Sequence, residues 1–469
     1  MTESTLVALL SDREIGVVSR DRRGRLRFTY REQWRTASDA VPLSLSIPLA
    51  AAEHPHKRID PFLWGLLPDN ELVLERWAGQ FHVSARNAFA LLSHVGEDCA
   101  GAVQLVRQER LDLLRSARDP EVQWLDKAGV AKRLGALRAD HAAWRSPGDT
   151  GQFSLAGAQP KTALLYHDGR WGVPSGRMPT THILKPPAAE LNGHAENEHF
   201  CLALAREIGL PAAATEVLRF GEEVAIVIER YDRARTAPLA AAAAAESAAI
   251  AASVDHPTSR ATAAAVASRA AALAALAKAQ PVLRLHQEDM CQALGIPPTL
   301  KYQGEGGPSP EDIIALLRAH SVRSEEDVGT FIDALAFNWL VAGTDAHAKN
   351  YSVLHGGGGR ARLAPLYDIA SALPYPQLHV QRLALAMKVG GKYRLLRIGL
   401  HEWRKLATDV RLPADETISR IAELASRVVE SIPIVRDRAV SQGLTHPILP
   451  RLAGALARRA HECLKLLRA

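Results

Sequence analysis

The chain has 469 residues, enough for about three domains or for one two-lobed enzyme with an added subdomain. Its hydrophobic fraction of 47% and charged fraction of 23% are ordinary for a globular protein that buries a large core. The net charge of +6 permits contact with nucleic acid or nucleotide phosphates but identifies neither.

The four cysteines lie far apart in the sequence and form no CxxC pair. This spacing argues against a disulfide framework and a cysteine zinc site, and it favours a reducing, cytoplasmic location. The opening residues, MTESTLVALLSDREIG, place acidic residues close behind a short apolar run and lack a basic leader. We therefore expect no secretory signal.

Residues 1–110 are expected to form an α/β subdomain. Alternating polar and apolar residues over 25–30 predict a half-buried strand, and Glu71–Phe81 reads as a helix. Residues 111–150 are charged and rich in leucine and alanine, which favours a helical connector. Its helix is predicted over 127–144.

A turn cluster at 146–151 precedes a strand-rich domain at 151–283. The sequence predicts three strands and one helix, and the helix ends before Gly209 and Pro211. We therefore expect a small sheet with one helix packed on it. The strands and the helix are expected at Thr162–Tyr166, Thr181–Lys185, Val224–Glu229 and Glu196–Ile208.

Residues 234–280 are dominated by alanine and form an insertion in this domain. Alanine favours helix, but the segment has few large apolar residues with which to dock, so we expect it to be partly helical or disordered. Charges and a proline interrupt its apolar runs, which excludes a membrane span. The rest, 284–469, is expected to be mainly helical, with a polar loop at 303–310 and hairpins around 355–360 and 390–392.

A concentrated group of polar residues follows an apolar, helix-like segment of this last domain. Asp345, His347, Lys349 and Asn350 fall within six residues, and a predicted hairpin then leads to Asp368. Phosphoryl transfer uses a carboxylate that accepts the proton of the attacking hydroxyl, together with an Asn and an Asp that hold Mg²⁺. The residue types and their order match this need. Taken singly, each residue is better explained as capping a turn or a helix, and only the combination favours the catalytic interpretation.

Three weaker features could also belong to a nucleotide-binding site. The small-residue segment Ser154–Thr162 could place N–H groups around phosphates, although it lacks the Walker A spacing and could be an ordinary hairpin turn. Lys185 ends a predicted strand and precedes Glu198 on the following helix, a pair that kinases use at the nucleotide phosphates. The run 226–231 is either a core strand or a hinge that meets adenine.

Together these segments resemble the HipA family of serine/threonine kinase toxins from bacterial toxin–antitoxin modules. The matching blocks run in order over nearly the whole chain, and only the alanine-rich insertion and about the last hundred residues match loosely. The blocks are FLWGLLPDN (62–70), SLAGAQPKTALL (154–165), THILK (181–185), NEHFCLALAREIGL (197–210), IERYDR (228–233), RLHQEDMCQALG (284–295), KYQGEGGP (301–308), GTDAHAKNYSV (343–353) and LAPLYDI (363–369).

The resemblance implies an α+β, two-lobed kinase fold with an N-terminal α/β subdomain and a mainly helical C-terminal lobe. It makes Asp345 the catalytic base, puts Asn350 and Asp368 on Mg²⁺, and makes Ser154 a self-phosphorylated serine whose modification expels the phosphate loop. The residues that it assigns to ATP are Ala156, Gly157, Ala158, Gln159, Pro160, Lys161, Lys185, Glu229, Arg230, Tyr231, His347, Ala348, Lys349, Asn350, Tyr367 and Asp368.

The resemblance also implies partners. They are a HipB-like helix-turn-helix antitoxin, operator DNA bound through the antitoxin complex, and a protein substrate such as the glutamyl aminoacyl-tRNA synthetase, whose inactivation halts translation. Two features depart from the pattern: Pro160 stands where a polar residue is expected, and the insertion follows the hinge directly. A small-molecule phosphotransferase and a non-catalytic corepressor remain the alternatives.

Overall fold

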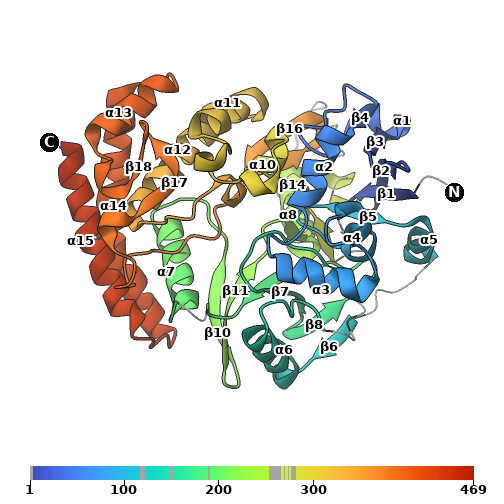
Figure 1. Cartoon of the computed structure of the whole chain (residues 1–469), viewed down its shortest axis with the longest axis horizontal. Coiled ribbons are helices and arrows are strands. Elements are labelled where there is room, and N and C mark those ends of the chain that lie inside the picture. Colours follow the sequence, from blue (N-terminus) through green and yellow to red (C-terminus); the bar gives the residue numbers. More distant parts are fainter. Residues whose placement is uncertain are drawn as a thin grey trace.

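The structure is a computed structural model of the whole chain, with the N-terminal sheet at one end of its long axis and the C-terminal helices at the other (Figure 1). The strands of a second, larger sheet lie between these ends. The residues that it describes are 4–116, 122–146, 149, 153–188, 191–252, 266–268, 270–272, 274–275 and 281–468.

The N-terminal subdomain is a five-stranded antiparallel sheet, in the order β4-β3-β2-β1-β5, covered by helices. The strand predicted over 25–30 is present as β3, in which Leu26, Phe28 and Tyr30 alternate inward into the core. Asn70 caps the predicted helix, whose bounds are as expected, by accepting a hydrogen bond from the Leu72 N–H. The elements are β1 (Ser4–Leu10), β2 (Arg13–Arg20), β3 (Leu26–Tyr30), α1 (Glu32–Arg35), β4 (Glu53–Pro55), α2 (His56–Gly65), α3 (Glu71–Phe81), α4 (Ala88–Val95) and β5 (Val103–Val106).

The connecting region contains α5 (Gln108–Ser116), β6 (Val122–Leu125) and α6 (Lys127–Ala139). The helix predicted over 127–144 ends five residues early because the Asp140 carboxylate accepts the Ala142 N–H and turns the chain. Strand β6 was not predicted, and it joins the next sheet. Four residues of the expected turn cluster, 147, 148, 150 and 151, lie outside the described residues.

The central sheet has six antiparallel strands in the order β10-β11-β9-β7-β8-β6. Three of them are the predicted strands, while β8 and β10 are hairpin partners that sequence patterning missed. Helix α7 contacts both this sheet and the C-terminal helices, so ten of its fourteen residues are buried. The elements are β7 (Thr162–His167), β8 (Arg170–Pro174), β9 (His182–Lys185), α7 (His194–Glu207), β10 (Thr215–Phe220) and β11 (Glu223–Glu229).

The two ends of the alanine-rich insertion lie next to each other in the fold. Strand β12 (Arg233–Arg235) pairs with β13 (Val282–Arg284), so the two ends of the insertion lie side by side. Helix α8 (Thr236–Ala252) confirms the prediction of partial helix. Residues 253–265, in the middle of the insertion, lie outside the described residues.

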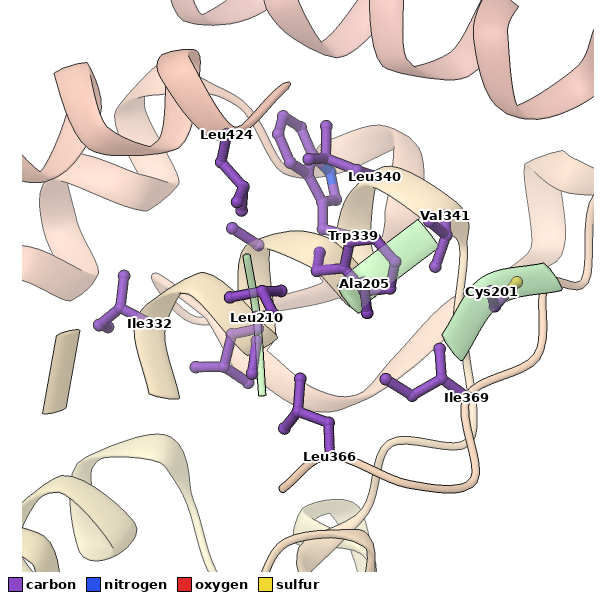
Figure 2. Packing of buried hydrophobic residues seen from close by; sticks show 14 of the residues in the cluster. Cys201, Ala205, Leu210, Ile332, Trp339, Leu340, Val341, Leu366, Ile369 and Leu424 are labelled. Atoms are coloured by element: carbon purple, nitrogen blue, oxygen red, sulfur yellow. The ribbon is translucent and has the colours of Figure 1, made fainter. Parts of the chain in front are cut away.

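The C-terminal lobe is built around α12, whose apolar end packs into the largest core. Figure 2 shows Trp339 and Val341 there with Leu366 and Ile369, which lie on either side of Asp368 along the chain. The predicted hairpins are present as β15-β16 and β17-β18, and β14 was missed. The helices and strands are β14 (Gln287–Asp289), α10 (Met290–Leu294), α11 (Pro310–His320), α12 (Ser324–Val341), β15 (Ser352–Gly356), β16 (Arg360–Leu363), β17 (Ala384–Val389), β18 (Lys392–Arg394), α13 (Leu400–Asp409), α14 (Ala414–Ser441) and α15 (Ile448–Arg468). Short 3₁₀ turns complete the lobe at η1 (Pro298–Leu300), η2 (Gln303–Glu305), η3 (Ala348–Asn350), η4 (Gly357–Gly359), η5 (Val380–Arg382) and η6 (Leu395–Arg397).

Candidate active site

A pocket of about 380 Å³ is lined by residues of the central sheet, the N-terminal subdomain and the C-terminal lobe. Most residues that the sequence assigned to a nucleotide site line it, although they come from five separate segments of the chain. Pro160, Ala348 and Ser154 are the predicted residues that do not. The predicted residues in its wall are Ala156, Gly157, Ala158, Gln159, Lys161, Lys185, Glu229, Arg230, Tyr231, Asp345, His347, Lys349, Asn350, Tyr367 and Asp368.

A buried lysine in the wall of this pocket joins two carboxylates. The Lys185 ammonium, on β9, donates to Glu198 Oε1 of α7 at 2.9 Å and to Asp368 Oδ1 at 2.7 Å. Burial alone would lower the pKa of Lys185, but the two carboxylates outweigh it and hold that pKa above its ordinary value. The same ammonium keeps the pKa of Asp368 below its ordinary range against the effect of burial. Lys185 is therefore positively charged and Asp368 negatively charged at pH 7.

Asp368 has a backbone conformation that few residues other than glycine adopt, with φ of +58°. Its neighbours Leu366 and Ile369 are buried in the large core, which holds the chain in this position. The strained backbone thus presents the carboxylate to the pocket rather than to a helix cap.

The loop after α12 presents the predicted catalytic base. The loop begins at Gly343. This position requires glycine, because a Cβ there would lie only 2.2 Å from Asn338 Oδ1. Asp345 is exposed at the pocket, and its Oδ1 accepts a hydrogen bond of 2.6 Å from the Tyr302 hydroxyl. Asn350 Nδ2 donates to the Asp345 main-chain carbonyl at 2.8 Å, which closes the loop and holds the two predicted site residues together.

The segment from Ser154 to Lys161 forms a loop of small residues along one wall of the pocket. Gly157 has φ of +100°, and a Cβ there would meet Lys161 Nζ at 2.5 Å, so glycine is required. Lys161 Nζ donates to the Ala156 carbonyl at 2.6 Å. Burial, together with the neighbouring Lys185 ammonium, lowers the pKa of Lys161 to about 8. Ser154 is fully buried, and its hydroxyl donates to the Leu66 carbonyl at 2.7 Å.

The predicted hinge lies at the end of β11, but its side chains point to two different places. The Tyr231 ring lies 5.7 Å from the Tyr367 ring beside the pocket, measured between ring centroids. The Arg230 guanidinium instead enters a buried ion cluster, donating to Asp232 at 2.8 Å and to Thr180 Oγ1 at 2.9 Å. The Arg230 side chain is therefore committed to this cluster, and its main-chain N–H already donates to the Thr181 carbonyl at 2.9 Å.

Sequence reasoning gave no role to four polar residues at this site. Asp69 accepts hydrogen bonds from Lys349 and Lys301, and Tyr302 binds Asp345. Burial raises the pKa of Asp289, at the edge of the pocket, to about 7 even though Lys349 opposes the shift. Asp69, Lys301, Tyr302 and Asp289 all fall within sequence blocks that carried the family resemblance, which was the available signal.

Asn350 and Asp368 offer the oxygen donors that Mg²⁺ prefers, namely an amide carbonyl and a carboxylate. Both line the pocket. In the described ranges, no group of three or more His, Cys, Asp or Glu side chains is placed to hold a metal ion. Mg²⁺ in kinases is held by one or two protein side chains together with nucleotide phosphates, so this pair of residues fits the ion.

The sheet with its packed helix, the helical lobe and the pocket define a two-lobed kinase fold of the α+β class. Two family models match the sequence: the HipA N-terminal domain over residues 6–106 and the HipA-like C-terminal domain over residues 153–432. The chain belongs to the HipA family.

Relatives with kinase names cover most of the chain. A putative kinase, Y4mE, of Sinorhizobium fredii is 34% identical over 98% of this chain and 98% of its own. The serine/threonine-protein kinase toxin HipA of Shewanella oneidensis is 28% identical over 86% of this chain and 82% of its own.

One solved structure shares the fold over almost the full length. It is the complex of HipA, HipB and operator DNA of Shewanella oneidensis, with a TM-score of 0.76 and 24% identity, covering 99% of this chain and 98% of the other. None of the helices within the described residues has the length and apolar character that crossing a membrane requires.

Proposed function

We propose that this protein is an ATP-dependent serine/threonine protein kinase toxin that transfers the γ-phosphate of ATP to a protein. One observation carries the proposal: Lys185, which pairs with the buried Glu198, and its second partner Asp368 line the pocket that also contains Asp345 and Asn350. This combination supplies every part that phosphoryl transfer requires of a protein.

Each part has a role that follows from its position. Lys185, oriented by Glu198, would contact the nucleotide phosphates. The Asp345 carboxylate would accept the proton of the attacking hydroxyl, and its exposure lets a hydroxyl on another protein reach it. Asn350 and Asp368 would hold Mg²⁺, which neutralises charge on the phosphates. Glu229 and Tyr231, which line the pocket, would contact adenine.

We also propose that phosphorylation of Ser154 silences the kinase. The Ser154 side chain is fully buried against the Leu66 carbonyl. A phosphate adds about two negative charges and three oxygens, which this position cannot hold beside a carbonyl. The modified serine would leave the position and take the start of the nucleotide loop with it.

The partners are proposed from the family. The relative of known structure was solved with HipB and its operator DNA, which supports a HipB-like antitoxin and operator DNA as partners of this chain. An aminoacyl-tRNA synthetase such as the glutamyl enzyme is the proposed substrate, and the cytoplasm, where this substrate is found, is the proposed location.

Incubation with Mg²⁺ and labelled ATP tests the central proposal. We expect label on protein with the native sequence and none with Asp345→Ala. Asp437→Ala is the matched control, because this aspartate is an exposed residue of α14 away from the pocket. Label on a small acceptor would instead indicate a small-molecule phosphotransferase, and no turnover would indicate a non-catalytic corepressor.

A further inference from the structure

A short segment of the N-terminal subdomain lies between the two loops of the candidate site. This segment, Leu66–Asn70, contacts the nucleotide loop at three points. Ser154 Oγ donates to the Leu66 carbonyl at 2.7 Å, the Asp69 N–H donates to the Gly157 carbonyl at 3.1 Å, and Asn70 Nδ2 donates to the Ala158 carbonyl at 3.3 Å.

The Asp69 side chain faces the other loop. Its Oδ1 accepts a hydrogen bond from Lys349, and its Oδ2 accepts one from Lys301 Nζ at 3.1 Å. Burial raises the pKa of the Asp69 carboxyl, but the two ammonium groups outweigh this effect and lower it below the ordinary value. The Lys301 carbonyl also accepts the Ala348 N–H at 3.2 Å, so Asp69 and Lys301 together hold the loop that carries Asp345.

We propose that Asp69 is a positioning residue of the kinase site, and that segment Leu66–Asn70 couples the nucleotide loop to the catalytic loop. This inference rests on the proposed function and extends it to regulation. A group that displaces Ser154 from the Leu66 carbonyl removes the contacts of the nucleotide loop with this segment. The Asp69 main chain then loses its partner, and the carboxylate loses its fixed position between the two lysines.

The charges explain why loss of the Asp69–Lys349 ion pair would disturb the catalytic loop. The Lys349 side chain is only 3% exposed, and Asp69 is its ion-pair partner. Removal of one member of a buried pair leaves the other charge uncompensated, which is far more costly than the pair is stabilising. Lys349 would then shift toward water or toward the phosphates, and the neighbouring Asn350 would shift with it.

Asp69→Asn tests the positioning role because it removes the charge and keeps the main-chain bond to Gly157. The control is Glu71→Gln, an exposed residue at the start of α3. We expect kcat to fall about tenfold or more, because displacing a catalytic group by about 1 Å can cost up to about 10²-fold in rate. The KM for ATP should change less than kcat does, because the contacts with the nucleotide loop remain. Equal activity in both variants would overturn the proposal, as would a loss confined to KM.

Hydrogen exchange tests the coupling without relying on activity. Ser154→Glu places a charge where the buried hydroxyl lies, and we expect faster exchange in both the nucleotide loop and residues 345–351. In protein with Asp69→Asn, where 345–351 is already loosened, adding Ser154→Glu should accelerate exchange there no further. Unchanged exchange of 345–351 in the Ser154→Glu protein would refute the coupling, even if Asp69→Asn does not fold. Absence of phosphoryl transfer in the native protein would refute only the proposed function.

Discussion

Two buried lysines lie in one pocket, and we expect their replacement by methionine to have different effects on stability. Lys185 is held by two carboxylates, Glu198 and Asp368, and Glu198 is completely buried. Its replacement leaves these carboxylates without their shared cation, which costs about 3–5 kcal/mol by analogy with broken buried pairs. We therefore expect Lys185→Met to lower the melting temperature clearly.

Lys161 is in a different position. Its pKa falls from 10.5 to about 8, so holding its charge in the folded state costs roughly 3 kcal/mol at pH 7. Lys161→Met removes that cost, and it gives up the hydrogen bond to Ala156, worth about 1 kcal/mol, and the ammonium contact 5.1 Å from the Trp144 ring centre, worth about 1 kcal/mol. We expect this variant to melt at the same temperature as the native protein or slightly higher.

The measurement is thermal unfolding at pH 7 of both variants, with Lys132→Met on the exposed face of α6 as the control. A pH series adds a second test. The unfolded chain binds more protons at Lys161 between about pH 8 and 10.5, so this group makes native stability rise with pH across that window. Lys161→Met should lack this contribution. Equal destabilisation by the two pocket substitutions would refute the reasoning.

Four further outcomes follow from the site. Asp345→Ala and Asp368→Ala should each abolish phosphorylation with the fold retained, and only Asp368→Ala should weaken Mg²⁺-dependent nucleotide binding; normal turnover by either variant in a labelled-ATP assay would contradict the assignment. Tyr302→Phe should lower kcat about tenfold with nucleotide affinity unchanged in a binding titration, because one hydrogen bond to a charged group is lost. Deletion of 237–280 should preserve folding and turnover within about twofold, since the ends of the insertion already meet in the β12-β13 ladder, and an insoluble product would contradict this. Mass spectrometry should find phosphate on Ser154 in the active protein and none with Asp345→Ala, and equal phosphate in both would point to another kinase.

The structure also refines the design of the deletion. A junction placed directly after Arg233 would remove strand residues that the fold uses. Arg233 is buried and donates to Asp98 at 2.8 Å, and the Thr236 N–H donates to the Pro281 carbonyl at 3.0 Å. A junction from Thr236 to Pro281 therefore keeps the ion cluster and the ladder intact.

The amino-acid sequence by itself determined the local features of this protein. The period of apolar residues located β3, β7, β9, β11 and most of α7, because side-chain alternation and helix-stop residues act over a few positions. The types and order of Asp345, Asn350 and Asp368 along the chain predicted a phosphoryl-transfer site, because this chemistry needs a carboxylate base followed by two magnesium ligands. The structure brings these residues together in one pocket.

Only the tertiary structure decided which side chains face the pocket and what holds them there. Arg230 follows the predicted hinge strand, yet long-range partners such as Asp98 and Thr180 draw its guanidinium into the interior. Asp69 meets Lys349 across 280 positions of sequence, and such pairs leave no periodic signal. Strands β6 and β10 were missed because each lies at an edge of the central sheet, where a strand is stabilised by its neighbour as much as by its own residues.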